Sequence, residues 1–483
     1  MALSDSSVID TPILQLEQHY IDMQSGTLTC GPMYRNGTLD LHAMAMFASL
    51  NFFFEDDTYL ANVKTLKPAH RYLVRPGNAP EVSTRWRWYK EEHLCTPSEA
   101  LRAFAEVLDG AVSRGCKNKK NLLSISSGID SRNLAAALCE NYDVESYSYG
   151  YKKESQENRI AAEVAAACGF KHASYEIPRG YLWDKLDDIA ARNHCEEDPC
   201  IVRQVGVLDI LRAQKRTFVL GHIGDILFDR PNISAEANLD AQLQHLLGSF
   251  VKPGGMWIAE TLWRVWGLDG NFQDYAQERF VDSLKRIEIG DAAARLRALR
   301  LMTWVPRFTS LGVGVFDDWN NLVLPFYDDA MAPLVCEMPE RYLANRKLQL
   351  EYIRSRSPKL AAIVWDKVAP YSINTAHRYG GVGHFMYRVF QRARRTANHL
   401  IGNKAPISQR NWELQLLDDD NLGQLKRVFD ETRVDWLPSD MLRLTYDRFK
   451  EDPNRETAYA VGALLAMCMF AKSRPVKSEQ IAV

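Results

Sequence analysis

The sequence predicts an α/β protein in three parts: a small β-rich N-terminal domain, a parallel-sheet core and a mainly helical C-terminal part. Between residues 97 and 230, strand-like apolar runs alternate with helical patterns, as is typical of a parallel sheet covered by helices on both faces. Two of these runs end in small-residue turns that each carry one aspartate. Residues 1–95 favour short strands, residues 235–475 favour helices, and we take 97–475 as one domain.

The first aspartate-bearing turn, Ser126-Ser127-Gly128-Ile129-Asp130-Ser131, follows the apolar run 121–125 and leads into a helical pattern. A strand, a tight turn and a helix start present backbone N–H groups to an anion. The carboxylate of Asp130 is suited to hold Mg²⁺. The turn lacks the spacing of a Walker-type P-loop or a dinucleotide-binding loop. An ordinary turn rich in Ser, Gly and Asp is the alternative interpretation.

The elements that follow fit a parallel sheet. Residues 144–150 predict a second strand and residues 171–177 a third. Between them lies a predicted helix, with Ser155 as its N-cap and Gly169 as its C-terminal stop.

The second aspartate-bearing turn, Gly221-His222-Ile223-Gly224-Asp225, follows the apolar run 218–220. Ligands of open α/β sheets bind at the carboxyl ends of the strands, where both turns are expected. Mg²⁺ is commonly held by one or two protein carboxylates together with substrate phosphates. Asp130 and Asp225 are therefore a plausible pair of ligands for one Mg²⁺ ion.

Both loops resemble signature sequences of class B asparagine synthetases and their amide-forming relatives. The first is similar to Ser-Gly-Gly-x-Asp-Ser, the pyrophosphatase loop, and the second to Gly-x-Gly-x-Asp-Glu-x-Phe. The resemblance covers residues 97–470 and implies an ATP-pyrophosphatase core of the adenine nucleotide alpha hydrolase-like kind. It also implies an AMP-forming ligase, in which ATP activates a carboxylate as an acyl-adenylate and ammonia or an amine attacks it.

The resemblance also implies a set of site residues. Mg²⁺ would be held by Asp130 and Asp225. ATP and pyrophosphate would be bound by Ile125, Ser126, Ser127, Gly128, Asp130, Ser131, Ser148 and Gly221.

Lys367 is the predicted catalytic lysine. It follows the segment 322–328, which resembles a sequence motif of the family: an aliphatic residue, two further residues and then Pro-Phe-x-Asp. In the family, a lysine after that motif contacts the phosphate side of the adenylated intermediate. A fixed ammonium stabilises the negative charge that builds as pyrophosphate leaves. The alternative is an ordinary surface lysine.

His222 is the second predicted catalytic residue. Its place in the loop holds glutamate in asparagine synthetases, tyrosine in β-lactam-forming relatives and histidine in lasso-peptide cyclases. The attacking amine must lose a proton, and histidine can accept one near neutral pH. We therefore expect His222 to deprotonate or position the nucleophile. The alternative is a turn histidine that only hydrogen-bonds its loop.

Three positions depart from the family pattern. Ser127 replaces the leading glycine of the first loop, which costs energy if that position needs a positive φ or a very close phosphate approach. Ile223 replaces the second glycine of the second loop, and Ile226 replaces the glutamate after the aspartate.

The N-terminus departs further. Full asparagine synthetases begin with a glutamine-hydrolysing domain whose nucleophile is an N-terminal cysteine, whereas the first cysteine here is Cys30. Residues 59–74 and Trp86-Arg87-Trp88-Tyr89 resemble only the segment that closes that domain. We expect residues 1–95 to be a truncated remnant without glutaminase activity. The nitrogen would then come from free ammonia, a partner protein or an amine substrate.

The amino-acid composition further limits the classes of protein to which the chain can belong. The 483 residues are 46% hydrophobic and 25% charged, as is ordinary for a globular protein, and the net charge of −2 gives no reason to expect nucleic-acid binding. The longest nearly apolar run, residues 458–471, is too short to span a bilayer. The nine cysteines follow no disulfide or zinc spacing, which together with the absence of a signal peptide favours a cytoplasmic protein.

Three functional hypotheses remain open at this point. The first is a ligase that joins ammonia or an amine to a small-molecule carboxylate. The second is an intramolecular amide former of the lasso-peptide cyclase or β-lactam synthetase type, acting on a peptide or a similar substrate. The third is a degenerate relative that binds nucleotide or a partner without catalysis, for which Ser127 is the best support.

Overall fold

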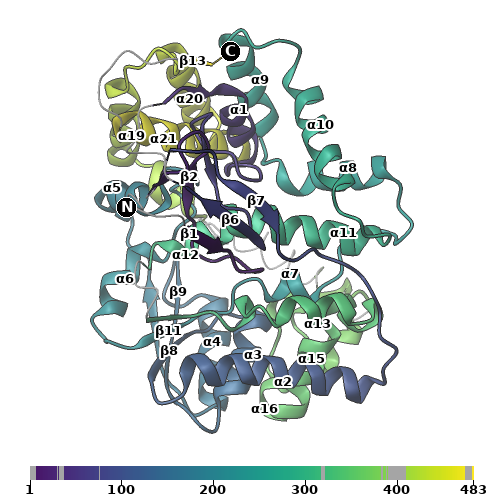
Figure 1. Ribbon diagram of the computed structural model, residues 1–483. Coiled ribbons are helices and arrows are strands. Elements are labelled where there is room, and N and C mark those ends of the chain that lie inside the picture. The colour runs from purple at the N-terminus through teal and green to yellow at the C-terminus, as the bar shows by residue number, and fades with distance from the viewer. Residues whose placement is uncertain are drawn as a thin grey trace.

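The computed structural model describes residues 7–29, 31, 37–75, 77–316, 321–381, 385–387, 389, 410–473 and 481–482, so Cys30 lies outside the described residues. Figure 1 shows the parallel sheet with its helices at one end of the molecule and a helical layer at the other. The N-terminal strands lie between these two ends. No helix among the described residues is both long and apolar enough to cross a membrane.

The core is a five-stranded sheet in the order β10-β9-β8-β11-β12, and all of its pairings are parallel. Its strands are β8 Lys120–Ser124, β9 Asp143–Gly150, β10 Lys171–Glu176, β11 Thr217–Val219 and β12 Leu322–Val323. The first four lie where the alternating pattern predicts them, which confirms the α/β fold class. The fifth, β12, was not predicted as a strand because only two residues pair in it.

Helices cover both faces of this sheet (Figure 1). The helix after the second strand begins and ends as predicted: the hydroxyl of Ser155 accepts a hydrogen bond from the Asn158 amide at 3.1 Å, and Gly169 has φ +71°. Between residues 97 and 230 the helices are α2 Pro97–Cys116, α3 Ile129–Leu138, α4 Gln156–Ala167, α5 Tyr181–Asn193, α6 Val205–Arg212 and α7 Gly224–Phe228.

The N-terminal layer is β-rich, as predicted, but it also contains a buried helix. Its two larger antiparallel sheets are β1-β6-β7 and β3-β2-β5, and β4 pairs with the C-terminal β13. Helix α1, Leu41–Leu50, was missed because it is apolar on every side and so has no helical period. The strands are β1 Ser7–Asp10, β2 Tyr20–Asp22, β3 Leu28–Thr29, β4 Leu39–Asp40, β5 Val63–Thr65, β6 His70–Val74, β7 Glu81–Thr84 and β13 Ile481–Ala482.

The rest of the chain is mainly helical, as predicted. One segment is a π-helix, η2 Arg300–Thr309, which contains Pro306. The apolar run near the C-terminus forms α21 Arg455–Ser473, whose Phe470 ring stacks on Tyr59 of the N-terminal layer at 3.8 Å. The other helices are α8 Leu239–Phe250, α9 Gly255–Val265, α10 Phe272–Lys285, α11 Ala292–Leu299, α12 Ser310–Gly314, η4 Pro325–Tyr327, α13 Met331–Glu337, α14 Glu340–Leu343, η5 Ala344–Arg346, α15 Lys347–Arg356, α16 Pro358–Ala362, η6 Asp366–Val368, η7 Ile373–Arg378, α18 Asn411–Leu416, α19 Asp419–Glu431 and α20 Ser439–Glu451.

Three consecutive buried acids, Glu196-Glu197-Asp198, lie where the N-terminal layer meets the helical part. Glu196 accepts hydrogen bonds at 2.9 Å from the Tyr20 hydroxyl and from Arg307 of η2. Asp198 accepts one at 3.1 Å from Asn51, the residue that ends α1. Glu197 lies between them, and its Oε2 is buried with no donor among the described residues. This short segment therefore joins the layers at the cost of burying acidic groups.

Burial has a large effect on these carboxyl groups. It raises the pKa of Glu196 to about 7 and that of Asp198 to about 6, although Arg307 and the Cys200 amide respectively act in the opposite direction. Burial and the neighbouring Asp198 raise the pKa of Glu197 well above its ordinary value. The folded chain therefore holds protons that the unfolded chain releases, so these groups lower stability as pH rises from their ordinary pKa values towards 7.

We predict that Glu197→Gln raises the free energy of unfolding at pH 8 by at least about 1 kcal/mol, since one pKa unit corresponds to about 1.4 kcal/mol. The gain should shrink as the pH falls towards about 4, because below its ordinary pKa the wild-type group is protonated in both states. Denaturant titrations at pH 5, 6.5 and 8 test this, with Glu260→Gln on the exposed side of α9 as the control. The charge of Lys252 acts to lower the pKa of Glu197, so a loss of stability at pH 8 would show instead that Glu197 is needed as an anion beside this lysine.

Candidate functional site

The two predicted loops are in direct contact at the carboxyl end of the sheet. Strands β8 and β11 pair in parallel, with Leu123 opposite Val219, so the loops that follow them leave the sheet side by side. A Cβ on Gly221 would lie 3.1 Å from both the carbonyl carbon of Asp130 and the amide of Ser131. Only a residue without a side chain fits there comfortably, which explains the glycine.

The first loop leaves a helix N-terminus open. Gly128 is the N-cap of α3 and offers no side-chain cap. The serines stabilise the turn itself: the Ser126 amide donates to the Ser131 hydroxyl and the Gly128 amide to the Ser126 hydroxyl, both at 3.1 Å. The first amides of α3 are thus free of side-chain caps, and such a helix end favours an anion.

These loops line a cavity of about 340 Å³. Seven of the predicted site residues form part of its wall: Ser126, Gly128, Asp130, Ser131, Gly221, His222 and Asp225. Its other lining residues include Tyr149, Gln204, Trp304, Thr309 and Arg346.

Three predicted ATP-binding residues are not part of this wall. Ile125, just before the first loop, and Ser127, within it, are both buried. Ser148 is buried on β9, where its hydroxyl is hydrogen-bonded to His172 at 3.2 Å and Ser174 at 3.0 Å of the neighbouring strand β10. The structure therefore does not bring Ser148 to the cavity.

Asp130 is held by two residues that the sequence analysis did not single out. The Gln349 amide donates to its Oδ1 at 2.7 Å, and the Arg346 guanidinium pairs with the same oxygen. Its Oδ2 has no donor among the described residues. Burial raises the pKa of Asp130 to about 6, opposed by Arg346 and reinforced by the negative charge of Asp225. The two aspartates are therefore close enough to repel each other, as two ligands of one cation would be.

The carboxylates fit a magnesium ion held mainly by substrate. The described residues contain no group of three or more His, Cys, Asp or Glu side chains that could form an all-protein metal site. Asp225 is exposed and Oδ2 of Asp130 has no donor among the described residues, so both carboxylates can offer oxygen to an ion that takes its other ligands from phosphates and water.

A second cavity of about 290 Å³ adjoins the first and shares Asp225, Ile226 and Arg346 with it. Lys367 lines this second cavity together with Arg230, Arg297 and Arg300. Arg297 is committed to Glu340 through two hydrogen bonds of 2.7 Å. The Nε of Arg300 is buried without an acceptor among the described residues, and burial lowers the pKa of its guanidinium. This basic cavity is suited to a phosphate chain that leaves the first cavity.

Arg132 positions the segment that carries Lys367. Its buried guanidinium donates to the carbonyls of Ile363 at 3.0 Å and Val364 at 2.9 Å, just before η6. Because Arg132 lies in the first turns of α3, it fixes the lysine segment to the first loop. The only sequence signal for this role is that Arg132 directly follows the loop motif.

The departures from the family pattern have different structural consequences. Ser127 does not have a positive φ, so the backbone imposes no penalty on serine there. Ile223, in contrast, has φ +62° and ψ 0° as the N-cap of α7. A β-branched residue in the left-handed region is strained by about 1–2 kcal/mol. The strain thus falls on the second loop, next to Asp225.

His222 lines the first cavity and is half-buried. Its Nδ1 is buried without a partner among the described residues. Burial lowers the pKa of His222 to about 4, with Asp225 acting in the opposite direction. The imidazole is therefore neutral at pH 7 and able to accept a proton.

Residues 103–302 match the asparagine synthase family model, and the matched segment includes both loops and strands β8 to β11. The chain contains an asparagine synthase domain. The match suggests an ATP-dependent amide ligase of the asparagine synthetase type. A search of curated proteins found no match to the chain. Lys367 lies beyond the matched residues.

We predict that Gly224→Ala disrupts the site without unfolding the protein. A Cβ at Gly224 would overlap Oδ1 of Asp130 and lie 3.0 Å from Nε2 of Gln349. Displacement of Asp130 should weaken binding of magnesium–ATP by at least about tenfold, or about 1.4 kcal/mol. Calorimetric titration measures this, with Gly248→Ala as control because its Cβ would meet nothing within 4 Å. Equal affinities for the two variants would exclude Asp130 as a determinant of nucleotide binding.

Proposed function

We propose that the protein is an AMP-forming amide ligase that activates a carboxylate with ATP and transfers the acyl group to ammonia or an amine. The observation that carries this proposal is the pairing of Asp130 and Asp225 across one cavity, beside the uncapped N-terminus of α3. A basic cavity that contains Lys367 continues from it. Carboxylates that can hold a cation, together with N–H and cationic groups that can bind an anion, suit a magnesium-bound polyphosphate.

The first loop and the basic cavity would bind the phosphates of ATP. The open amides of α3 would contact one phosphate, while Arg300, Arg346 and Lys367 would face the phosphates that leave. Asp130 and Asp225 would hold Mg²⁺, which offsets phosphate charge. Because these groups are fixed before the reaction, their main contribution is positioning and charge stabilisation.

The chemistry proceeds in two displacements. An oxygen of the substrate carboxylate attacks the α-phosphorus, the bond between the α-phosphorus and the bridging oxygen breaks, and pyrophosphate leaves. The nitrogen nucleophile then attacks the acyl carbon, loses a proton and displaces AMP. Lys367 would stabilise the charge that develops on pyrophosphate in the first step.

His222 would act in the second displacement. It lies in the loop beside Asp225 and is neutral at pH 7, so it can accept a hydrogen bond or a proton from the attacking nitrogen. A pKa of about 4 makes it a weak base, which favours positioning of the nucleophile over full proton removal. We propose that the activated carboxylate belongs to a small molecule or a peptide.

We predict that Lys367→Gln lowers the rate of AMP and pyrophosphate formation by about 100-fold or more, the size expected on removal of one group that stabilises developing charge. The dissociation constant for ATP should change by less than about threefold, or about 0.7 kcal/mol. Phosphorus NMR distinguishes AMP and pyrophosphate from ADP and phosphate, with a panel of carboxylates and ammonium as substrates. Lys359→Gln, at an exposed position of α16, is the matched control. Formation of ADP would contradict the proposed reaction.

We predict that His222→Gln slows amide release more than adenylation. The wild-type rate should be flat between pH 6 and 8 and fall below about pH 5, where the imidazole gains a proton and can no longer accept one. The variant should lack this acid limb. Rapid-quench measurement of adenylate and amide over pH 4.5–8 tests the assignment, and an unchanged rate of amide release in the variant would remove His222 from the mechanism.

A further inference from the structure

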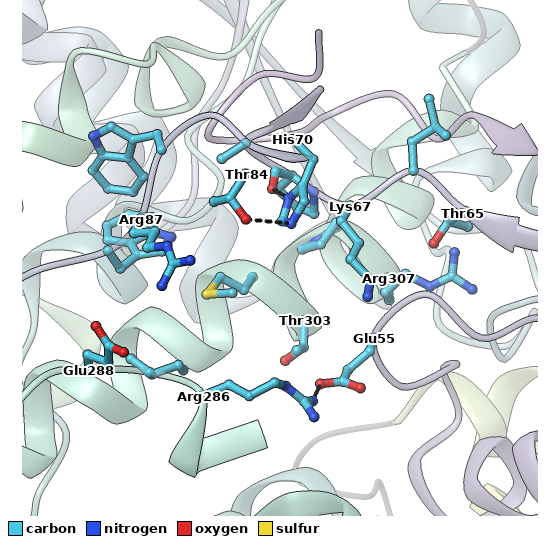
Figure 2. Close-up of a pocket in the computed structure, with 18 of the residues that line it drawn as sticks. Glu55, Thr65, Lys67, His70, Thr84, Arg87, Arg286, Glu288, Thr303 and Arg307 are labelled. Atoms are coloured by element: carbon cyan, nitrogen blue, oxygen red, sulfur yellow. Dashed lines mark hydrogen bonds and ion pairs between the residues drawn. The ribbon is translucent and has the colours of Figure 1, made fainter. Parts of the chain in front are cut away.

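A third cavity, of about 580 Å³, lies between the N-terminal layer and the helical part (Figure 2). Small-molecule sites typically measure about 300–1,000 Å³. The cavity shares no lining residue with the first cavity, because η2 stands between them. From this π-helix, Met302, Thr303 and Pro306 line the third cavity, whereas Trp304 and Thr309 line the first cavity.

One wall of the third cavity is aromatic and apolar. Trp86, Trp88 and Tyr89 follow β7 and line it, and the ring of Trp86 meets the ring of Trp88 edge to face at 4.8 Å. Met302 of η2 and Ile287, which follows α10, add further apolar surface to the lining. A flat hydrocarbon body would bury its surface well among such side chains.

Cationic groups outnumber anionic groups around the space. Lys67, Arg87 and Arg286 are labelled with Glu55 and Glu288 in Figure 2. Lys67 pairs with Asp56 at 3.2 Å, and Arg286 pairs with Glu55, but Arg87 is exposed and has no acceptor among the described residues. The guanidinium of Arg87 thus offers an unused set of donors at the aromatic wall.

His70 does not add to the positive charge. Burial lowers its pKa, and its Nδ1 lies 2.7 Å from the carbonyl oxygen of Pro68. A neutral ring with its proton on Nδ1 leaves Nε2 as an acceptor towards the Thr84 hydroxyl at 3.4 Å. Arg307 also lines the space; its Nη2 donates to Glu196 and to the Asp57 carbonyl, while its Nε and Nη1 are buried without an acceptor among the described residues.

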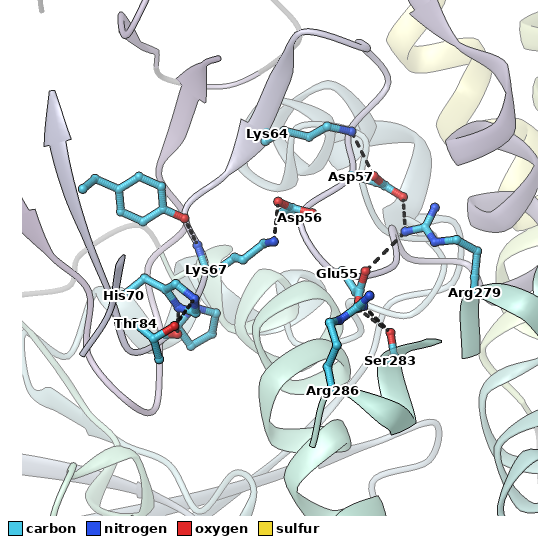
Figure 3. A network of polar contacts seen from close by, with 12 residues as sticks. Glu55, Asp56, Asp57, Lys64, Lys67, His70, Thr84, Arg279, Ser283 and Arg286 are labelled. Atoms are coloured by element: carbon cyan, nitrogen blue, oxygen red, sulfur yellow. Dashed lines mark hydrogen bonds and ion pairs between the residues drawn. The ribbon is translucent and has the colours of Figure 1, made fainter. Parts of the chain in front are cut away.

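A network of ion pairs beside the cavity holds the N-terminal layer and the helical part together (Figure 3). Arg279 of α10 donates to Asp57 at 3.0 Å and to Glu55 at 3.4 Å, and Lys64 donates to Asp57 at 2.9 Å. Burial alone would raise the pKa of Asp57, but Arg279 and Lys64 outweigh it and lower the pKa. This network fixes the N-terminal layer against α10, so the cavity is formed before any ligand arrives.

We propose that the third cavity is a second ligand site, which binds an anionic organic molecule with an aromatic or other flat apolar body. The body would lie against Trp86 and Trp88, and the anionic group would pair with Arg87 and Lys67. A carboxylate and a phosphate ester both satisfy this chemistry. The site is independent of ATP turnover and can be tested by binding alone.

The test is calorimetric titration of the full chain with 2-naphthoate, 2-naphthyl phosphate and the neutral 2-naphthamide. At least one anion should bind about tenfold more tightly than the amide, since a charge-assisted hydrogen bond contributes about 1.5 kcal/mol or more. The anion that binds better identifies the carboxylate or the phosphate as the natural group. Binding should persist with the nucleotide cavity saturated by an ATP analogue carrying a methylene bridge between the α- and β-phosphates.

Substitutions locate the site. The double variant Arg87→Gln, Lys67→Gln should remove the preference for the anion, while Arg85→Gln should retain it, because Arg85 donates to the Thr11 carbonyl and does not line the cavity. Thermal unfolding of each variant verifies the fold. The proposal is overturned if no probe binds, if the amide binds as tightly as both anions, if the double variant keeps the preference, or if the ATP analogue displaces the probe.

Discussion

The contact between the two strand-end loops is the constraint on which the rest of the site depends. Parallel pairing of β8 with β11 brings the loops together, and Gly221 allows the second loop to lie against the Asp130–Ser131 peptide. Gly224 allows the same close approach to the carboxylate of Asp130. The two aspartates can share one cation only because two positions in a short loop lack side chains.

Charge balance at this contact links the two adjoining cavities. Asp130 is half-buried beside another carboxylate, and Arg346 and Gln349 contact it at one oxygen. Arg346 also lines the basic cavity with Arg300 and Lys367. A bound cation and polyphosphate would add charges of both signs where the protein already presents both. The buried Arg132 of α3 hydrogen-bonds the segment that precedes Lys367, and so fixes the position of that lysine relative to the first loop.

Most strands of the core could be predicted from local sequence patterns, whereas contacts between residues far apart in the chain could not. Alternation of strands and helices gave four strands of the sheet, and Ser155 and Gly169 marked the ends of α4 as expected. Helix α1 lacks a helical period because all its sides are buried, and β12 is too short to leave a pattern. Arg346 and Gln349 reach Asp130 from more than 200 positions along the chain, a distance that no local pattern spans. The family resemblance implied Ser148 as an ATP-binding residue, but its hydroxyl is hydrogen-bonded to residues of β10.

The most direct test of the central claim is ATP–pyrophosphate exchange in the presence of Mg²⁺ and a panel of carboxylates, without any amine, on the wild type and Asp130→Asn. A ligase that forms an acyl-adenylate must return labelled pyrophosphate to ATP before the nitrogen arrives. The account predicts exchange that requires one class of carboxylate and disappears in the variant. Absence of exchange with a carboxylate that the protein converts to an amide once an amine is added, or exchange that survives loss of Asp130, would contradict it.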